Sequence, residues 1–394
     1  MAKLIEITGK VLSGEWGTDD ESGNGIPVLR TTNFTNEGIV DYSNVVTRTI
    51  QKKNIDAKYL RKGDIIIEKS GGSDKQPVGR VIYFDGPEST YLFNNFTGLL
   101  RVKNQAVWLP RYVFYSLFHN YRKGGTRPFE SKTTGLHNLK TDDYISRYEV
   151  LEAPISEQQS ICKQLDYVYD IIKTRQQQLQ KLDELVKARF VEMFGDPLLD
   201  DGRYCKAPLG CLAQVGSSKR IFEKEYVSEG IPFYRTKEIV ELSNGNKIST
   251  ELFITPKRYN EIRDEYGVPQ AGDLLISAVG TIGVIWIVDG KNDFYFKDGN
   301  LLRVANSDNF MPVYLKCLLE TLICAHKSKM SSGTAYAALT ISTLKEMPVY
   351  KVPLAEQSQF STFVSQVDKS KVAVQKSLDE AQHLFDCLMQ EYFS

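Results

Sequence analysis

The stretch "GIPVLRT" at residues 25–31 returns as "GIPFYRT" at residues 230–236. Five of the seven positions are identical, and the two copies begin 205 residues apart in a chain of 394 residues. A second echo pairs "KGDIIIEK", from Lys62, with "AGDLLISA", from Ala271. The chain therefore carries an internal duplication, with one copy in each half.

Further matches keep the same order along both halves. They are, first copy before second, "GLLRVKN" (98–104) and "NLLRVAN" (300–306), the apolar helical runs opened by Pro110 and Pro312, "HNLK" (137–140) and "STLK" (342–345), and "APISEQQ" (153–159) and "VPLAEQS" (352–358). A period near 200 residues is too long for a solenoid, so each copy has the size of a domain. The sequence predicts the same order of elements in each copy: mixed strands, one helix, a loop rich in Gly, Ser and Thr, a last strand and a long helix.

A long amphipathic helix is predicted at the end of each copy. Apolar residues recur in steps of three and four, as in a heptad seam, which Arg175 and Lys371 interrupt. The seam residues are Ile161, Leu165, Val168, Ile172, Leu179, Leu182, Val186, Phe190 and Met193, and then Phe360, Phe363, Val367, Val374, Leu378, Ala381, Phe385, Leu388 and Tyr392. About 38 residues give a helix of roughly 57 Å. We expect the two seams to cover each other; the alternative is that each helix packs separately on its own domain.

The composition is that of a globular protein, with 42% hydrophobic and 25% charged residues. No apolar run approaches the roughly 20 residues that cross a bilayer, and the N-terminus shows no secretion-signal pattern, so we expect a soluble cytoplasmic protein. None of the six cysteines forms a Cys-x-x-Cys pair, and the four histidines are scattered, so no metal site is expected. The net charge is zero, with an excess of four positive charges in residues 1–150, which leaves affinity for a polyanion to local patches or to partners.

Catalytic motifs for nucleotide or methyl-donor chemistry are missing from the sequence. There is no Gly-x-Gly-x-x-Gly after a strand, no Walker lysine motif and no Asn/Asp-Pro-Pro-Tyr. In "GDIIIEK" Lys69 directly follows Glu68, which is the wrong spacing for a nuclease, and Ser277 replaces Glu68 in the second copy. We interpret Asp64 and Asp273 as turn or cap residues. We interpret His137 as a loop histidine rather than a general base.

Two loops that follow the equivalent helices are candidates for contact with nucleic acid. They are "RKGGTRPFESKTTG" (122–135) and "HKSKMSSGTAYAA" (326–338). Their mixture of cations, hydroxyl groups and an aromatic ring suits contacts with phosphates and base edges, although solvated loops have the same composition. The Gly-rich turns "KSGGSDKQPVG" and "SAVGTIG" could cradle phosphate or could be tight connections between strands.

The arrangement resembles the specificity subunit of a type I restriction–modification system. The resemblance covers essentially the whole chain and rests most on "PISEQQSICKQLD" with "LDELVKARFVEMFGDP", on "PLAEQSQFSTFVSQVDKSK" with "QKSLDEAQHLFDCLMQEYF", and on "GTIG" after "GDLLIS". It implies an α+β fold with two pseudo-twofold-related target recognition domains, separated by two long antiparallel coiled-coil helices. The expected boundaries are recognition domains at 1–153 and 196–352 and spacer helices at 154–195 and 353–394.

The resemblance also implies a division of labour between this chain and its partners. Each domain would read one half of an asymmetric split site in double-stranded DNA, and the helices would set the spacer and dock methyltransferase subunits, two of them, with restriction (translocase) subunits joining through the complex. Methylation, with S-adenosylmethionine, and cleavage, with ATP and Mg²⁺, would lie on those partner chains, and this chain would have no catalytic or metal-binding residues and no cofactor. Two alternatives stay open: a specificity module of a fused or type II-like system, and a helical adaptor without DNA contact.

The predicted DNA-binding residues lie where the two copies diverge while keeping the same place between elements. They are Lys69, Ser70, Lys75, Lys132, Thr133 and Thr134 in the first copy, and Ser277, Thr281, Ser332, Thr334 and Tyr336 in the second.

Overall fold

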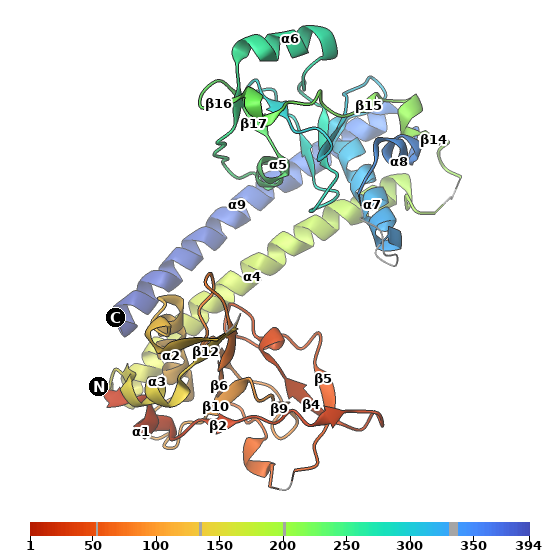
Figure 1. Ribbon diagram of the computed structural model, residues 1–394. Coiled ribbons are helices and arrows are strands. Elements are labelled where there is room, and N and C mark those ends of the chain that lie inside the picture. The colour runs from red at the N-terminus through yellow and green to blue at the C-terminus, as the bar shows by residue number, and fades with distance from the viewer. Residues whose placement is uncertain (53, 134–135, 200–201, 331–337) are drawn as a thin grey trace. The chain divides into compact units, whose positions relative to one another are not determined.

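The computed structural model describes residues 1–52, 54–133, 136–199, 202–330 and 338–394 (Figure 1). The chain forms two compact units: unit 1 comprises residues 1–176 and 376–394, and unit 2 comprises residues 177–375. The long helices α4 (Ile155–Phe194) and α9 (Leu354–Phe393) each contribute one half to each unit.

Unit 1 is built on short strands that pair mostly in antiparallel fashion. In its described part the strand orders are β2-β10-β6-β8, β3-β5-β4-β9, β11-β12-β7 and β1-β13. The strands are β1 (Ala2–Lys3), β2 (Leu12–Ser13), β3 (Thr18–Asp19), β4 (Ile26–Leu29), β5 (Val46–Thr49), β6 (Ile65–Glu68), β7 (Ser70–Gly72), β8 (Val81–Tyr83), β9 (Leu92–Phe93), β10 (Thr97–Leu100), β11 (Glu130–Thr133), β12 (Leu136–Leu139) and β13 (Glu149–Val150). All four residues of β6 are buried, as expected for an apolar strand at the centre of its sheet.

Short helices connect these strands, and one longer helix covers them. They are α1 (Leu4–Thr8), η1 (Thr31–Asn33), η2 (Asp56–Lys58), α2 (Pro110–Arg122), η3 (Arg127–Phe129) and α3 (Thr141–Arg147). Helix α2 begins at Pro110, whose missing N–H costs nothing in the first turn. Its Phe114 ring lies 5.6 Å from the ring of Tyr83 in β8, so α2 packs on the sheet.

Unit 2 repeats the plan of unit 1. Its strand orders among the described residues are β15-β22-β19-β20, β16-β18-β17-β21 and β14-β23. The strands are β14 (Lys206–Pro208), β15 (Val215–Gly216), β16 (Tyr226–Val227), β17 (Ile231–Tyr234), β18 (Phe253–Ile254), β19 (Leu274–Ser277), β20 (Ile285–Ile287), β21 (Tyr295–Phe296), β22 (Leu301–Val304) and β23 (Pro348–Tyr350). The helices are η4 (Leu209–Cys211), η5 (Glu223–Glu225), α5 (Thr236–Ser243), α6 (Pro256–Tyr266), α7 (Pro312–Met330) and α8 (Ile341–Glu346).

The repeated sequence motifs form equivalent elements in the two units. The two "Gly-Asp" runs form β6 and β19, each paired with the "Leu-Leu-Arg-Val" strand, β10 or β22. The motifs "GIPVLRT" and "GIPFYRT" form β4 and β17. Strand β4 pairs in parallel with β9, and β17 pairs in parallel with β21. This repeated mixture of sheets and helices, with two long helices, confirms the predicted α+β fold class.

The repeated aspartates hold the repeated arginines in buried ion pairs. Arg101 Nη2 lies 2.6 Å from Asp64 Oδ2, and Arg303 Nε lies 2.6 Å from Asp273 Oδ2. Each aspartate also accepts a hydrogen bond from the backbone N–H three residues earlier, which closes the turn before β6 or β19. The interpretation of both aspartates as turn residues is confirmed.

One of the predicted matches between the copies is wrong. Leu139 N–H donates to the carbonyl of Lys69, and Leu339 N–H donates to that of Ala278, the residue that follows β19 as Lys69 follows β6. Leu339, 200 residues after Leu139, is therefore its counterpart. "HNLK" (137–140) belongs mainly to β12, whereas "STLK" (342–345) lies in helix α8. The similarity of these two sequences is therefore a coincidence.

Within each unit the two long helices pack against each other in antiparallel directions. In unit 1 the Gln164 side chain accepts a hydrogen bond of 3.0 Å from Tyr392, and Arg175 Nε donates to Ser377 Oγ over 3.1 Å. In unit 2, Asp183 pairs with Lys371 at 2.6 Å. The prediction of paired helices is confirmed in both units, and the two charged residues that interrupt the seams make polar contacts across it.

Different contacts join the globular part of each unit to these helices. In unit 1, Arg111 of α2 lies 2.8 Å from Asp166 of α4, and Tyr115 also donates to that carboxylate. In unit 2 the ring of Tyr314 in α7 stacks 5.5 Å from that of Phe190 in α4. The contact of this helix with α4 is thus polar in unit 1 and aromatic in unit 2, while α2 also packs aromatic rings on α9.

Candidate nucleic-acid interface

In unit 1 the sheet β11-β12-β7 brings together the two groups of predicted DNA-binding residues. Lys132 and Thr133 lie in β11, while Ser70 lies in β7 and Lys69 directly precedes it. Strand β12 pairs with both neighbours and joins segments about 60 residues apart in the chain. The side chain of Thr133 and all of Thr134 lie outside the described residues.

An exposed ion pair connects the Gly-rich segment to β11. Lys132 Nζ lies 2.6 Å from Asp74 Oδ1, and Lys75, the next residue, is exposed. The hydrogen bond and charge of Lys132, together with the nearby His137, lower the pKa of the Asp74 carboxyl. Water screens such a pair, so it stabilises the fold little and can be exchanged for a DNA phosphate.

His137 lies beneath this surface and is 7% exposed. Its Nδ1 lies 2.9 Å from Glu130 Oε2, and the other oxygen of Glu130 accepts a hydrogen bond from Val78 N–H. The histidine lies in strand β12, so the prediction of a loop residue is wrong. It connects β12 to β11, and its other ring nitrogen, Nε2, lies 3.6 Å from Asp74 Oδ1.

The Gly-rich segment of unit 1 is a strand that bends around a buried ion pair. Glu68 lies 3.0 Å from the guanidinium of Arg80, which also donates to the carbonyls of Thr31 and Phe34. Gly71 adopts φ of +140°, and a Cβ there would lie 2.8 Å from Glu68 Oε1. Glycine is thus required by close packing, and Glu68 has a structural partner.

In unit 2 the predicted residues are placed differently. Ser277 is 0% exposed, and its Oγ contacts the carbonyl of Thr281 and accepts a hydrogen bond of 2.9 Å from Val284 N–H. Ser277 therefore closes the Gly-rich turn from inside, whereas Thr281 is exposed on that turn. Ser332, Thr334 and Tyr336 lie outside the described residues.

Two lysines that the sequence reasoning passed over share one carboxylate, and the charge of one of them, Lys58, acts on Lys69. Lys52 and Lys58 both contact the carboxylate of Glu15, with Lys52 Nζ at 2.7 Å from Oε1. The signal available in the sequence was the density of Lys and Arg between residues 51 and 62, within the one stretch of the chain that carries excess positive charge.

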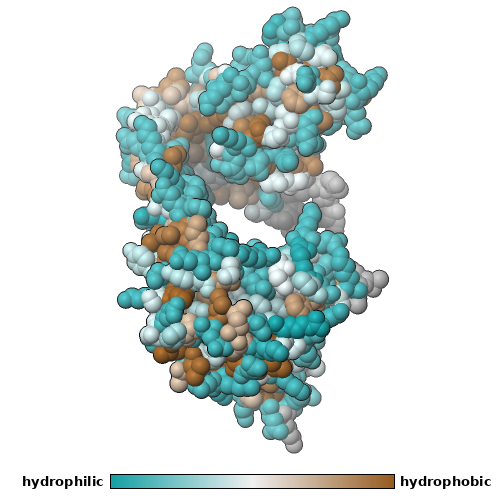
Figure 2. Space-filling view, turned by 90° about the vertical axis from the view of Figure 1, so that its left-hand side faces the viewer, coloured by the Kyte–Doolittle hydropathy of each residue, from teal (hydrophilic) through white to brown (hydrophobic). Residues whose placement is uncertain are grey.

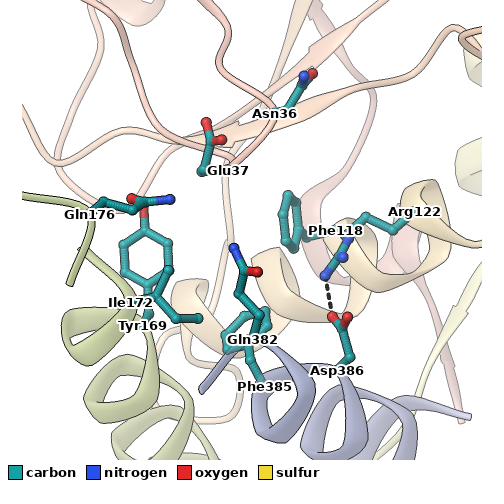
Figure 3. A pocket seen from close by; sticks show the side chains of 10 residues that line it. All are labelled: Asn36, Glu37, Phe118, Arg122, Tyr169, Ile172, Gln176, Gln382, Phe385 and Asp386. Atoms are coloured by element: carbon teal, nitrogen blue, oxygen red, sulfur yellow. Dashed lines mark hydrogen bonds and ion pairs between the residues drawn. The ribbon is translucent and has the colours of Figure 1, made fainter. Parts of the chain in front are cut away.

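Unit 1 has a cleft between α2, the loop at Asn36 and Glu37, and the two long helices (Figure 3). Its volume is about 360 Å³. Aromatic rings and amide side chains line it, and Arg122 forms an ion pair of 2.6 Å with Asp386 at one side. None of the predicted DNA-binding residues lines this cleft.

The surface seen in Figure 2 is largely hydrophilic, with hydrophobic residues in separate groups. Among the residues that the structure describes, no helix is both long and apolar enough to span a membrane. The same residues contain no group of three or more His, Cys, Asp or Glu side chains suited to a metal ion.

Comparison with known proteins identifies relatives of this chain. The family model for the type I restriction modification DNA specificity domain matches it twice, over residues 2–184 and 206–381. A putative type I restriction enzyme specificity subunit of Haemophilus influenzae is 30% identical over 187 residues, or 47% of this chain and 45% of that protein. The putative type I restriction enzyme MjaX specificity subunit of Methanocaldococcus jannaschii is 22% identical over 414 residues, or 97% of this chain and 91% of that protein. The match thus spans about half of the first relative and most of the second.

Solved structures with the same fold match this chain over its whole length. The S subunit of a type I restriction–modification system from M. genitalium has a TM-score of 0.54 at 15% identity, covering 100% of this chain and 95% of that one. A chain from a study of complex assembly and conformational transition of the type I R-M system has a TM-score of 0.56 at 16% identity, covering 100% and 96%. At this identity the likeness concerns the fold.

Proposed function

Because the chain belongs to the family of type I restriction modification DNA specificity domains, we propose that each of its units reads one half of a bipartite, asymmetric DNA site. The observation that carries the proposal is the duplication: the family model matches twice, and the same strand order recurs in both units. Two readers on one scaffold suit two half-sites on one duplex, and different side chains on the same elements make the site asymmetric.

In unit 1 we assign base reading to the sheet β11-β12-β7 and the turn beside it. Ser70, Lys75, Lys132, Thr133 and Thr134 supply hydroxyl and ammonium groups, which can donate to base edges in the major groove. Lys132 is exposed, and its ammonium group contacts the exposed Asp74, so it can exchange partners on binding. In unit 2 the corresponding role falls to Thr281, Ser332, Thr334 and Tyr336, while the buried Ser277 shapes the turn.

The paired helices α4 and α9 set the spacer between the half-sites and dock two methyltransferase subunits, with the restriction subunits joining through that complex. Large apolar side chains exposed on these helices support a protein partner: Tyr167 is 69% exposed in unit 1, and Val372 is 71% exposed in unit 2. Apolar residues exposed along a helix gain stability when a partner covers them. The sites for S-adenosylmethionine, ATP and Mg²⁺ belong to those partner chains, since this sequence carries none of their motifs, and the complex works in the cytoplasm.

The test is to express the chain with its methyltransferase subunit in a host without other modification and to sequence the methylated bases of the genome. The expected result is one split motif with a gap of constant length, which disappears when this chain is omitted. Mobility shifts with a duplex carrying that motif then separate the alternatives. A helical adaptor would leave DNA binding unchanged when the predicted side chains are replaced, and a fused or type II-like module would act without separate partner subunits.

A further inference from the structure

Lys52 and Lys58 of unit 1 share the carboxylate of Glu15, and Lys58 is close enough to Lys69 to lower the pKa of its ammonium group. Lys69 Nζ donates a hydrogen bond of 2.8 Å to Ser13 Oγ. These five residues are called the lysine cluster below. The cluster contains three lysines and one carboxylate, so it carries local positive charge in a chain whose net charge is zero.

The backbone holds two of these lysines in place. Lys58 ends helix η2, and Arg101 donates to the carbonyls on either side of it, to Ala57 over 3.1 Å and to Tyr59 over 2.9 Å. Lys69 is fixed by its own N–H, which donates to Phe96, and by its carbonyl, which accepts from the N–H of residue 139. The backbone that carries these two side chains is therefore fixed before an anion binds, which lowers the entropy lost on binding.

A glycine makes room for the side chain of Lys69. A Cβ at Gly98 would lie 2.3 Å from Val11 Cγ1 and 3.3 Å from Lys69 Cδ, so the bare backbone of β10 leaves room for Val11 and for the aliphatic part of the lysine. In unit 2, Ala278 stands at the position of Lys69 and Asn300 at that of Gly98. Both Lys69 and Gly98 are thus replaced by other residues in unit 2, so unit 2 has no equivalent of this part of the cluster.

The positive charge of Lys69 is only partly balanced by nearby negative charge in the protein. Partial burial lowers its pKa, and the positive charge of Lys58 lowers it further, while Asp142 acts in the opposite direction. A half-buried ammonium beside another cation is unfavourable, and an anion that approaches both would relieve this repulsion.

We infer that the lysine cluster binds a phosphate of the DNA backbone next to the first half-site and thereby positions β11-β12-β7 over its bases. The inference rests on the proposed function and deepens it. It assigns Lys69 to phosphate binding rather than to base reading, and it adds Lys58 and Lys52 to the contact surface. Only the half-site read by unit 1 gains this contact.

The experiment uses the assembled complex of this chain with its methyltransferase subunits and a duplex carrying the methylated motif. The dissociation constant is measured between 50 and 200 mM salt for the wild type and for Lys69→Met and Lys58→Met. Each lost phosphate contact should reduce the slope of log K against log salt by about 0.9. Lys69→Arg should keep the slope, and so should Lys257→Met, which removes the same charge from an exposed site on α6. The methylated motif should stay the same in every variant, and thermal unfolding verifies that each one folds.

Two results would overturn the inference and leave the proposed function intact. One is an unchanged salt slope in both methionine variants while the wild type still selects its motif. The other is a relaxed base preference in Lys69→Met, which would make Lys69 a base reader. If the wild-type complex shows no preference for the motif, the proposed function fails, and the inference fails with it.

Discussion

The side-chain oxygen of Gln158 accepts a hydrogen bond of 2.9 Å from the backbone N–H of Leu109, just before helix α2. The amide nitrogen of Gln158 donates to two carbonyls, that of Val107 over 2.9 Å and that of Ala153 over 2.8 Å. The glutamine is fully buried, and it joins the first turns of α4 to the segment that leads into α2. The repeated Pro-x-x-Glu-Gln motif thus has a physical role.

Gln357 makes the same three contacts in unit 2. Its oxygen accepts from Met311 N–H at 2.7 Å, and its nitrogen donates to Asn309 over 3.0 Å and to Val352 over 2.8 Å. The two glutamines are therefore equivalent structural links between a long helix and its globular domain.

Replacing either glutamine by leucine should destabilise its unit strongly. Gln158→Leu leaves a buried N–H and two carbonyls without partners, at about 1–3 kcal/mol for each such group. Thermal unfolding of the purified chain measures the loss. The matched control is Gln159→Leu, because that neighbour is exposed and should change the midpoint little. Equal midpoints for both variants would contradict a structural role for Gln158.

Removing the arginine of a buried ion pair should also be costly. Arg101→Met leaves the buried Asp64 without its partner, which we expect to cost about 3–5 kcal/mol, and Arg303→Met does the same to Asp273 in unit 2. Denaturant titration gives the difference, with the exposed Arg61→Met as control. Only Arg101→Met should also reduce the salt slope of DNA binding, because Arg101 holds the backbone on both sides of Lys58.

The length of the paired helices should set the gap in the DNA site. Seven residues added to each helix lengthen the pair by about 10 Å, which is near three base pairs at roughly 3.4 Å each. Methylome sequencing should then show the same half-sites with a longer gap. Seven residues added to α4 alone should abolish modification, because contacts such as Asp183–Lys371 lose their register. An unchanged gap after the double insertion would exclude the helices as the spacer.

Each unit should control one half-site only. Substitutions within residues 122–135, such as Lys132→Ala, should relax one half of the methylated motif, and substitutions within residues 326–338 should relax the other half. A base-reading contact is worth about 1–3 kcal/mol at one base pair, which corresponds to roughly 5- to 150-fold in binding. Competition binding with single-base variants of the motif measures this. The one-unit, one-half-site model would be wrong if a substitution in unit 1 altered both halves alike.

The sequence predicted part of the candidate DNA-binding surface and misplaced two residues. Lys69, Ser70 and Lys132 were selected from two separate segments, and β12 does bring these segments together. The same reasoning placed His137 in a loop and included Ser277, whose side chain is buried. Burial depends on what packs above a residue, and a short polar stretch carries little information about that.

The sequence by itself determined the duplication, the long helices and their seams. Helix hydrogen bonds are local, so Pro154 before α4 and Gly195 after it mark its ends, and the spacing of apolar residues marks the buried face. Only the tertiary structure decided which strands pair, that Leu339 rather than the "STLK" stretch continues the repeat, and that Lys52 and Lys58 meet at Glu15 with Lys58 near Lys69. Strand partners and surface clusters come from segments far apart in the chain, and their register follows from packing, which no local pattern encodes.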